Sequence, residues 1–386
     1  MKRLRAAVAG AGLVGPVHVE ALRRLGIEVT GILGITKEEG RTVAERLNLD
    51  HYYSTFDELC ADSRVDVVHI CTPNYAHYPM ARSALLAGKH VVCEKPLTIQ
   101  SAEARELARL AHSKGLVGAV CFNMRYYPQI QEARSRVHYG EIGQVHILRG
   151  DSALDWLCQP SDWNWRLDPE LGGPLRAIAD FGSHWLDMLT WITGLRVTAV
   201  MADFATFIPV RYKPREEIHL YHESPEFTGK SDPVQMSSDD YAAVLLMYEG
   251  GAHGSLTVSQ VSPGHKDLFR WEINGSLASL AWESETPNQL WIGHREHPNE
   301  ILVKEPTLLH PEARGMAAFH SGHVEGYPDT FTQLFRDVYT YIDAGDPTLQ
   351  PGFPTFEDGW RNLALLERIA RSAEEKRWVE VKYEEL

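Results

Sequence analysis

The first third of the chain alternates short apolar runs with longer segments whose apolar residues recur every three or four positions. The apolar runs are typical of parallel strands buried on both faces, and they cover residues 3–9, 28–33, 65–71, 90–93 and 116–122. The longer segments have the spacing of amphipathic helices, and they cover residues 14–25, 37–47, 78–87 and 102–114. Strands and helices that alternate in this way predict an α/β fold with a doubly wound parallel sheet.

The pattern changes after about residue 125, where strand-like segments predominate. These segments cover residues 144–149, 197–204, 241–248, 254–261, 269–274 and 276–282. Short turns connect several of them, and Asn274-Gly275 is a strong hairpin signal. We therefore predict an α+β domain with a large, mostly antiparallel open sheet and helices over residues 182–193, 328–344 and 356–375. The polar stretch 214–238 is interpreted as a long excursion that forms a lid or an oligomer contact.

The acidic composition argues against two classes of partner. A net charge of −14 at pH 7 disfavours nucleic acid and anionic membrane surfaces, which are both met by basic proteins. No segment approaches the roughly 18 uninterrupted apolar residues of a membrane span, and Glu20 and the early glycines do not fit a secretory leader. Five scattered cysteines indicate neither a disulfide framework nor a structural zinc site. We expect a cytoplasmic protein with no bound metal.

A glycine motif stands at the first strand–helix junction, where residues 10–15 read GAGLVG and match G-x-G-x-x-G. Gly10 would allow the tight turn, Gly12 the close approach of backbone to a pyrophosphate, and Gly15 the packing of helix on strand. Chance glycines are the alternative, but the strand, the helix and the alternating domain all favour a cofactor site that includes Leu13 and Val14. We predict a Rossmann dinucleotide-binding domain over residues 1–125 and an α/β substrate-binding and oligomerisation domain over residues 126–386.

The end of the second predicted strand bears on the choice between NAD and NADP. A carboxylate is expected there to hold the ribose 2′-hydroxyl of NAD, but the chain has Gly34. Thr36 and Lys37 follow and could meet a 2′-phosphate, which favours NADP modestly. The alternative, that Lys37 only opens the next helix in solvent, has about equal weight. The cofactor is therefore NAD or NADP.

Polar residues follow the next two predicted strands. Cys71, Thr72, Pro73 and Asn74, with His77 behind them, come after residues 65–70, and the carboxyl ends of parallel strands face the ligand crevice. Asn74 could bond the cofactor or cap the following helix, and both readings have comparable weight.

Glu94-Lys95-Pro96 ends the following strand. A lysine at this place would lie near the nicotinamide, where its charge could bond a substrate hydroxyl and stabilise a developing alkoxide. A solvated lysine is the alternative.

A second cluster of titratable residues precedes a predicted helix in the second domain. Asp180 and His184 are four residues apart, so they share a helix face if the helix begins by Asp180, and they flank its first turn if Gly182 or Ser183 caps it. A histidine titrates near neutrality and suits the removal of a hydroxyl proton as hydride leaves. The alternative is a histidine buried in the core.

These motifs together resemble the Gfo/Idh/MocA family of oxidoreductases. The resemblance rests on the segments GAGLVG, CTPNYAH, CEKPL, FNMRYYP and GGPLRAIADFGSHWLD, in that order, and covers essentially the whole chain. It implies a Rossmann domain followed by a domain whose open sheet face forms a homodimer or homotetramer. It also implies three catalytic residues: His184 as proton acceptor, Lys95 to polarise the reacting oxygen, and Asp180 to position substrate. Glu94 and Asn74 would lie on the cofactor side.

Aromatic and polar residues mark a candidate sugar site. Indole faces pack on the C–H faces of a pyranose, while amide and guanidinium groups bond its hydroxyls. The candidate substrate-binding residues are Asn123, Arg125, Trp163, Trp165, Arg166 and His323. Tryptophans buried in the core and arginines in structural ion pairs are the alternatives.

The function expected is reversible hydride transfer between a nicotinamide cofactor and a secondary alcohol or ketone of a sugar, sugar derivative or inositol. One alternative is a glycosidase that keeps NAD bound and oxidises its substrate transiently. Another is a non-catalytic nucleotide-sensing protein on the same fold. Lys95, Asp180 and His184 together speak against the sensing protein.

Overall fold

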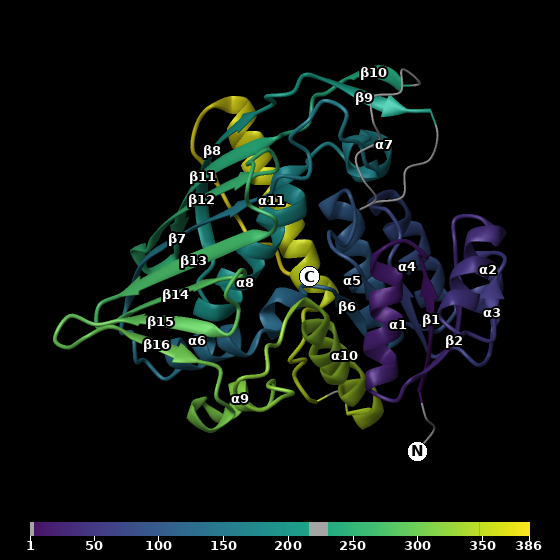
Figure 1. Cartoon of the computed structure of the whole chain (residues 1–386), viewed down its shortest axis with the longest axis horizontal. Helices are drawn as coiled ribbons and strands as arrows, with labels where there is room; N and C mark the ends of the chain where they lie inside the picture. Colours follow the sequence, from purple (N-terminus) through teal and green to yellow (C-terminus); the bar gives the residue numbers. More distant parts are fainter. Residues whose placement is uncertain (1–3, 216–230, 347) are drawn as a thin grey trace. The chain divides into compact units, whose positions relative to one another are not determined.

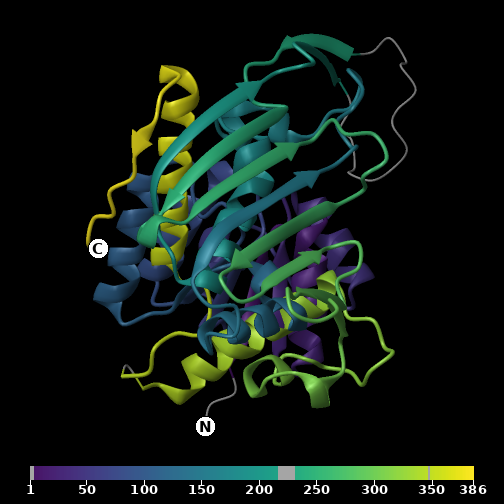
Figure 2. The same cartoon turned by 90° about the vertical axis from the view of Figure 1, so that its left-hand side faces the viewer.

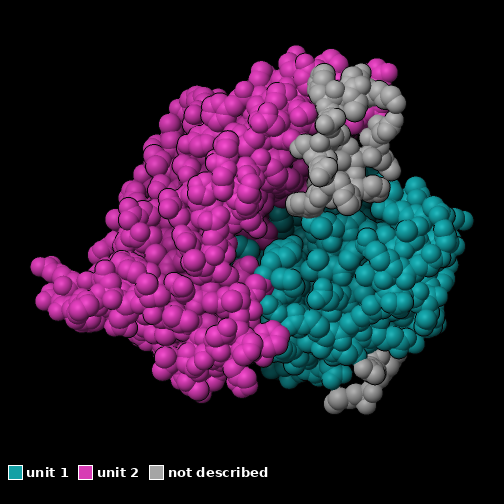
Figure 3. Space-filling model, viewed as in Figure 1, with its two compact units in different colours: residues 1–126, 327–363, 384–386 teal, residues 127–326, 364–383 magenta. Residues whose placement is uncertain are grey.

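The computed structural model describes residues 4–215, 231–346 and 348–386. The chain forms two compact units, coloured separately in Figure 3. Unit 1 comprises Met1–Tyr126, Tyr327–Leu363 and Glu384–Leu386, and unit 2 comprises Tyr127–Gly326 and Ala364–Tyr383. The chain thus first passes from unit 1 to unit 2 after Tyr126, one residue beyond the predicted boundary at residue 125. Residues 327–363, which the sequence placed in the second domain, pack in unit 1 instead.

Unit 1 is built on a six-stranded, all-parallel sheet in the order β3-β2-β1-β4-β5-β6 (Figure 1). The strands are β1 (Arg5–Ala9), β2 (Glu28–Leu33), β3 (Tyr52–Tyr53), β4 (Val67–Ile70), β5 (His90–Cys93) and β6 (Gly118–Val120). All four residues of β4 are buried, as expected for a strand covered on both faces. The strand order reverses between β1 and β4, so the ligand crevice of such a sheet lies at their carboxyl ends. The doubly wound prediction is confirmed.

The helices of unit 1 follow the predicted spacing closely. They are α1 (Val14–Arg24), α2 (Lys37–Arg46), α3 (Phe56–Ala61), α4 (His77–Leu86), α5 (Ser101–Lys114) and α10 (Tyr327–Ala344), with 3-10 turns at Asn74–Ala76 and Asn123–Tyr126. The sequence analysis missed α3, because six residues are too short for a clear helical period. Helix α11 (Phe356–Glu375) begins in unit 1 and ends in unit 2.

Aromatic packing explains why α10 belongs to unit 1. The rings of Phe331 and Phe335 lie 5.1 Å and 4.8 Å from the ring of His18 on α1, between centroids. Arg24 at the end of α1 bonds Asp329 near the start of α10 at 2.7 Å. Such contacts join residues more than 300 positions apart, so no local pattern could have indicated them.

Unit 2 contains a nine-stranded sheet in the order β16-β15-β14-β13-β7-β12-β11-β8-β17. Its strands are β7 (Val145–Ala153), β8 (Val197–Ala205), β11 (Tyr241–Tyr248), β12 (His253–Ser259), β13 (Leu268–Gly275), β14 (Ser279–Glu283), β15 (Gln289–Gly293), β16 (Glu300–Val303) and β17 (Val379–Glu380). Every pairing is antiparallel except that of β7 with β12. The predicted mostly antiparallel sheet is confirmed, although β14 starts three residues later than predicted because 276–278 form the hairpin turn.

The predicted excursion over residues 214–238 is described only at its ends. There, β9 (Val210–Pro214) pairs antiparallel with β10 (Ser231–Gln235) as a separate ribbon. Residues 216–230 lie outside the described residues, so the lid or oligomer contact expected of this stretch stays a prediction.

Helices cover one face of the large sheet. Unit 2 contains α6 (Pro128–His138), α7 (Pro169–Gly172), α8 (Ser183–Thr193) and α9 (Pro311–Arg314), with 3-10 turns at Trp165–Leu167, Glu249–Gly251 and Pro306–Leu308 and a π-helical segment at Ile178–Gly182. Of these, α6 packs on β14, β15 and α8. The buried Trp185 of α8 donates its indole N–H to the Arg270 carbonyl at 3.2 Å. Figure 2 views the face of the sheet that no helix covers, where Leu245 of β11 is 51% exposed.

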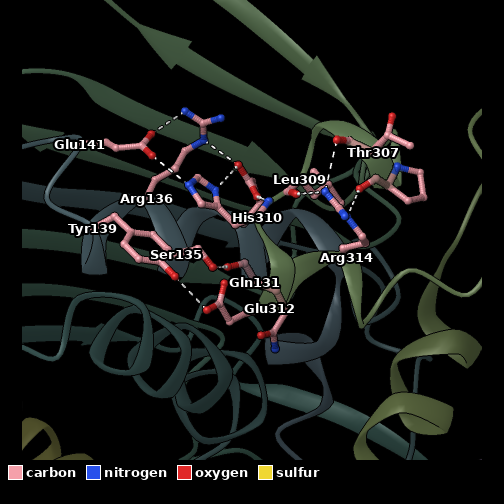
Figure 4. Close-up of polar contacts among 12 residues, drawn as sticks. Gln131, Ser135, Arg136, Tyr139, Glu141, Thr307, Leu309, His310, Glu312 and Arg314 are labelled. Carbon is pink, nitrogen blue, oxygen red and sulfur yellow. Dashed lines mark hydrogen bonds and ion pairs between the residues drawn. The ribbon is translucent and has the colours of Figure 1, made fainter.

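A polar cluster holds α6 against the segment that contains α9, as Figure 4 shows. The buried Glu132 carboxylate lies 3.0 Å from the His310 ring and accepts the His310 backbone N–H at 2.8 Å. His310 also lies 3.0 Å from Glu141, and Arg136 bonds both carboxylates at 2.8 Å.

Among the described residues, no helix has the length and apolar character needed to cross a bilayer.

Candidate functional site

The glycine loop after β1 leaves one open position. Gly10 has φ +114°, and a Cβ atom there would lie 2.5 Å from the Cys71 carbonyl oxygen, while one on Gly15 would lie 1.9 Å from the Gly10 carbonyl oxygen. A Cβ on Gly12 would meet nothing within 4 Å. The space above Gly12 is therefore where backbone and pyrophosphate could approach closely.

The amino end of α1 is suited to an anion. No side chain caps it, and its first turn has no acidic residue. Leu13 is 50% exposed beside it. Free backbone N–H groups and the positive end of the helix dipole favour a phosphate at this place. The residues present thus fit the dinucleotide that the motif predicts.

The end of β2 differs from the expected NAD site in its space as well as its sequence. A Cβ on Gly34 would lie 2.5 Å from the Gly40 backbone nitrogen, so a side chain at Gly34 is excluded by α2. The Thr36 hydroxyl caps α2 by accepting the Glu39 N–H at 3.1 Å, and the Glu39 carboxylate accepts the Ile35 N–H at 2.7 Å. Lys37 is exposed in the first turn.

The loop after β4 lies at the same sheet edge as the glycine loop, since the Cys71 N–H donates to the Ala9 carbonyl at 2.7 Å. Asn74 is buried, and no side chain caps the 3-10 turn Asn74–Ala76 or α4. Asn74 is therefore the first residue within the 3-10 turn and not the N-cap residue of the turn or of α4. A role toward the cofactor remains the prediction for this residue.

His77 joins the two loops that follow β4 and β5. Its ring nitrogens lie 2.8 Å from the Thr72 carbonyl oxygen and 2.8 Å from the Pro96 carbonyl oxygen. Burial lowers the pKa of His77, and the two carbonyl contacts oppose that shift. A neutral ring carries one N–H and can donate to only one of these two carbonyl oxygens, but its place between the loops still gives His77 a role in holding them together.

The loop after β5 presents Glu94 and Lys95, both partly exposed, ahead of a cis peptide bond to Pro96. The Lys95 backbone N–H donates to Glu94 Oε2 at 3.3 Å. The glycine loop and the loops after β4 and β5 thus stand at the carboxyl ends of three adjacent parallel strands. Unit 1 brings the predicted cofactor residues to one edge of its sheet.

In unit 2, Asp180 and His184 lie on one continuous helical stretch. Asp180 is within the π-helical segment and His184 is in the first turn of α8, and each is about 8% exposed. The helix thus begins before Asp180, which is the first of the two arrangements considered from the sequence. A π-helical segment inserts an extra residue into a helix and is frequent at functional sites.

A guanidinium group approaches Asp180 from the turn Trp165–Leu167. Arg166 Nε lies 3.1 Å from Asp180 Oδ2, and the Arg166 guanidinium lies over the rings of Trp165 and Trp156 at 4.5 Å and 5.5 Å from their centroids. Gln260 also donates to Asp180 Oδ2 at 3.2 Å. Aromatic, cationic and acidic groups therefore converge next to the predicted catalytic helix. The sequence analysis did not include Gln260, because a lone glutamine after a strand carries no signal.

Two consecutive aspartates anchor the start of the π-helical segment. Asp239 accepts the backbone N–H groups of Arg176 and Ile178 at 2.7 Å and 2.8 Å. Asp240 pairs with the fully buried guanidinium groups of Arg176 and Arg211, the latter at 2.9 Å. Arg176 is thus a structural ion-pair partner.

The other candidate substrate residues have partners elsewhere in their units. The Asn123 side-chain amide donates to Thr330 at 2.8 Å, and Arg125 lies 3.7 Å from Asp358. Trp163 lies under the Lys213 ammonium at 5.5 Å, and the side chain of His323 is exposed. Of this set, only Trp165 and Arg166 lie in the group around Asp180, and substrate contact for the rest stays a prediction.

Two family models match the chain. One, described as oxidoreductase family with NAD-binding Rossmann fold, matches residues 4–122. The other, described as the GFO/IDH/MocA C-terminal domain, matches residues 130–281.

Individual relatives match over nearly the whole chain. Levoglucosan dehydrogenase of Pseudarthrobacter phenanthrenivorans is 26% identical, covering 99% of this chain and 99% of that protein. Myo-inositol 2-dehydrogenase of Thermotoga maritima is 26% identical, covering 98% of each. A solved structure of levoglucosan dehydrogenase in complex with NADH and L-sorbose has a TM-score of 0.88 and 25% identity, covering 99% of this chain and 100% of that chain. The matches and the fold together show that the chain belongs to the Gfo/Idh/MocA family of oxidoreductases, with an NAD-binding Rossmann fold in its first unit.

Proposed function

We propose that the chain is an NAD(P)-dependent dehydrogenase that oxidises a secondary alcohol of a sugar, sugar derivative or inositol, or reduces the matching ketone. The observation that supports this most is the group around Asp180, where the buried carboxylate contacts a glutamine and a guanidinium that also lies over two indole rings, four residues before His184 on the same helical stretch. Indole faces and paired polar groups suit the alternating C–H and O–H surface of a polyol. The names of the levoglucosan and inositol relatives support the same class.

Each predicted catalytic residue has a distinct role in this proposal. His184 accepts the hydroxyl proton, Lys95 stabilises the negative charge that develops on the reacting oxygen, and Asp180 orients the substrate together with Arg166. The bound nicotinamide supplies the hydride acceptor. His184 and Asp180 are held on one rigid helical stretch, which favours a reproducible geometry for the proton transfer.

For the cofactor we propose a modest preference for NADP. The close contact of Gly34 with α2 leaves no room for the carboxylate that would select NAD, and the exposed Lys37 is available to a 2′-phosphate. The kcat/KM ratio for NADP over NAD should fall in Lys37→Ala. An unchanged ratio would remove Lys37 from cofactor selection.

We also propose a homo-oligomer, a dimer or a tetramer, that uses the open face of the large sheet. Leu245 and Ile147 are half-exposed on neighbouring parts of this face. Ion pairs lie beside them, with Arg149 2.9 Å from Glu272 and Arg270 2.6 Å from Asp151. Light scattering of Leu245→Asp should show smaller particles than the unmodified protein.

The decisive experiment is a substrate panel. Free pyranoses, anhydrosugars and inositols would be supplied with NAD or NADP, and absorbance of the reduced nicotinamide would be followed in time. Net reduction of cofactor with at least one polyol is expected. Bond cleavage of a glycoside without net reduction would favour the glycosidase alternative, and binding of cofactor without any turnover would favour the sensing protein.

A further inference from the structure

A row of four polar side chains runs through the interior of unit 1, and none of the proposed steps uses it beyond Glu94. Glu94 Oε1 lies 3.1 Å from His18 Nε2, and His18 Nδ1 lies 3.0 Å from His69 Nδ1. His69 Nε2 lies 2.9 Å from the Tyr339 hydroxyl. The row links the loop after β5 to α1, β4 and α10.

The surroundings of the row exclude water. His18 and His69 are completely buried and Tyr339 is 6% exposed, while Phe335 packs edge-on against both imidazole rings. Cys121 is the other titratable side chain in contact, with its sulfur 3.9 Å from His18 Nε2. In such a low-dielectric interior, a polar group without its partner is costly, and bonds in series polarise one another.

Only one proton arrangement satisfies every member while both histidines stay neutral. An ionised Glu94 only accepts, so His18 carries its proton on Nε2 and its Nδ1 accepts from His69 Nδ1–H. His69 Nε2 then accepts from the Tyr339 hydroxyl. Burial and the neighbouring His18 lower the pKa of His69 well below its ordinary value, which agrees with a neutral ring. Burial acts to raise the pKa of Glu94, but the contacts with His18, Lys95 and Cys121 together outweigh it and hold that pKa low.

We propose that Tyr339, His69 and His18 form a one-directional hydrogen-bond chain that keeps Glu94 ionised and oriented, so that its second oxygen holds the backbone of Lys95. The observed contact is the bond from the Lys95 N–H to Glu94 Oε2 at 3.3 Å. His18, His69 and Tyr339 are thus positioning residues for a lysine that they do not touch. This inference rests on the proposed function of Lys95.

Part of this row could instead form a metal site, because His18, Glu94 and the adjacent Cys121 offer ligand atoms within 4.8 Å of one another. The hydrogen-bond chain excludes this reading, since a metal would have to replace the Nε2 proton of His18. Elemental analysis should find the same metal content in Cys121→Ser as in the unmodified protein. A metal lost on substitution of Cys121 by Ser would overturn the chain.

The hydrogen-bond chain predicts that two substitutions of His18 differ strongly in their effect on kcat. His18→Gln keeps a donor toward Glu94 and an acceptor toward His69, whereas His18→Leu keeps neither. We expect His18→Leu to lower kcat by about tenfold or more and His18→Gln to retain most of it, because the leucine leaves Glu94 without its donor and His69 without its acceptor. Tyr339→Phe tests the far end, with a smaller loss of kcat at nearly unchanged Tm. Equal kcat in the unmodified protein, His18→Leu and Tyr339→Phe would overturn the proposal.

A measurement that needs no activity separates this inference from the proposed function. Long-range proton–nitrogen correlation spectra of 15N-histidine protein should assign the Nε2–H tautomer to His18 and the Nδ1–H tautomer to His69. The opposite tautomers, or a charged His18, would overturn the proposed hydrogen-bond chain even if the enzyme were active. If the protein showed the expected tautomers but no dehydrogenase activity, the hydrogen-bond chain would be supported. The proposed role of Lys95 would then be contradicted.

A separate cluster lies on the hairpin of β15 and β16 in unit 2. The register pairs Ile292 with Glu300, so His294, two residues further on, extends from the same face as Glu300. His294 Nε2 lies 3.2 Å from Glu300 Oε1, and the rings of His294 and His297 are 3.9 Å apart between centroids. His294 Nε2 is shielded from solvent and has no hydrogen-bond partner among the described residues, despite the nearby carboxylate.

We infer that this hairpin binds a divalent transition metal of the zinc class. One ligand atom each of His294, His297 and Glu300 lies within 4.8 Å of the others, and two imidazoles with a carboxylate form a ligand set that zinc accepts. The Asn299 side chain accepts the His294 backbone N–H at 2.9 Å and holds the loop closed. The sequence analysis expected no metal, because it considered only the scattered cysteines and not the His-x-x-His-x-x-Glu spacing of this hairpin.

Calorimetric titration of the full chain with Zn²⁺ tests the site. The unmodified protein and the control His265→Ala, which removes an exposed histidine elsewhere, should each bind one ion that His297→Ala does not bind. Absence of binding to the unmodified protein, or equal binding to His297→Ala, would overturn the inference.

Discussion

At the scale of single residues, the three glycines of the first loop have three different reasons to be glycine. Gly10 needs a positive φ and closeness to the Cys71 carbonyl, and Gly15 needs closeness to the Gly10 carbonyl. Gly12 has no internal neighbour at all. Its small size therefore serves a ligand, whereas Gly10 and Gly15 serve the fold.

This difference predicts opposite outcomes for two substitutions. Gly12→Val should leave the midpoint of urea unfolding nearly unchanged and weaken NAD(P)H binding, measured by nicotinamide fluorescence, by about tenfold or more, since the added methyl groups fill the open space. Gly15→Val should lower stability strongly, because backbone atoms that cannot move away would overlap the new side chain. A stable Gly12→Val protein with full cofactor affinity would contradict the assigned position of the pyrophosphate.

The catalytic pair is tested by single and double substitutions. His184→Ala should lower kcat by about two to four orders of magnitude, as expected for a lost general base, while NAD(P)H still binds. If Lys95 and His184 serve one step, Lys95→Ala should lower kcat by a smaller factor in the His184→Ala background than in the unmodified protein. Steady-state kinetics with His265→Ala as control would check this. Fully multiplicative losses would indicate separate steps.

At the scale of elements, the π-helical segment shows how a functional geometry is held from outside the helix. Asp239 satisfies two backbone N–H groups at the start of that segment, and Asp240 lies between two buried guanidinium groups. Burial raises the pKa of Asp239, and the two N–H bonds oppose that rise. The aspartates thus stabilise the helical stretch that contains Asp180 and His184.

Removing one anchor should therefore disturb both stability and activity. Asp239→Ala leaves two buried N–H groups without an acceptor, at about 1–3 kcal/mol each, so the free energy of unfolding and kcat should both fall. Asp232→Ala is the matched control, because it breaks an exposed pair with Arg215 that contributes at most about 1 kcal/mol. Urea unfolding and steady-state kinetics would be measured on both. An Asp239→Ala protein as stable as the control would refute the anchoring role.

At the scale of the whole molecule, three buried or half-buried histidines make stability depend on pH. Burial lowers the pKa of His69, His77 and His90, and the Val117 N–H that donates to His90 Nδ1 at 2.9 Å requires a lone pair on that ring. Below about pH 6.5 the unfolded chain protonates these rings while the folded state does not, so the unfolded state binds more protons.

The free energy of unfolding should therefore fall as the pH is lowered from 7 to 5, by up to about 1.4 kcal/mol per pH unit for each histidine. Burial raises the pKa of Asp239 and Asp337, so these two groups make the free energy of unfolding rise as the pH falls. Their effect is confined to pH values near and above the ordinary aspartate pKa. Urea unfolding at several pH values would measure the slope, and His69→Gln should make it shallower. Stability that stays constant or rises toward pH 5 would contradict the neutral histidines.

Much of the architecture was predictable because the signals are local. The periodicity within 10 to 20 residues indicated nearly every strand and helix of unit 1, and the glycine loop, Glu94-Lys95 and the Asp180–His184 spacing supplied the residues of the proposed cofactor and catalytic sites. Each of these inferences depends on neighbours in sequence.

Other features were decided only by tertiary packing. Residues 327–363 join unit 1 because their aromatic rings bury against α1, and Gly34 excludes a side chain because Gly40 lies against it. Arg166 is directed to Asp180 by two indole rings, and His18, His69 and Tyr339 meet across 51 and 270 positions of sequence. The free energy of these contacts comes from excluding water between distant segments, and no window of local sequence contains that information.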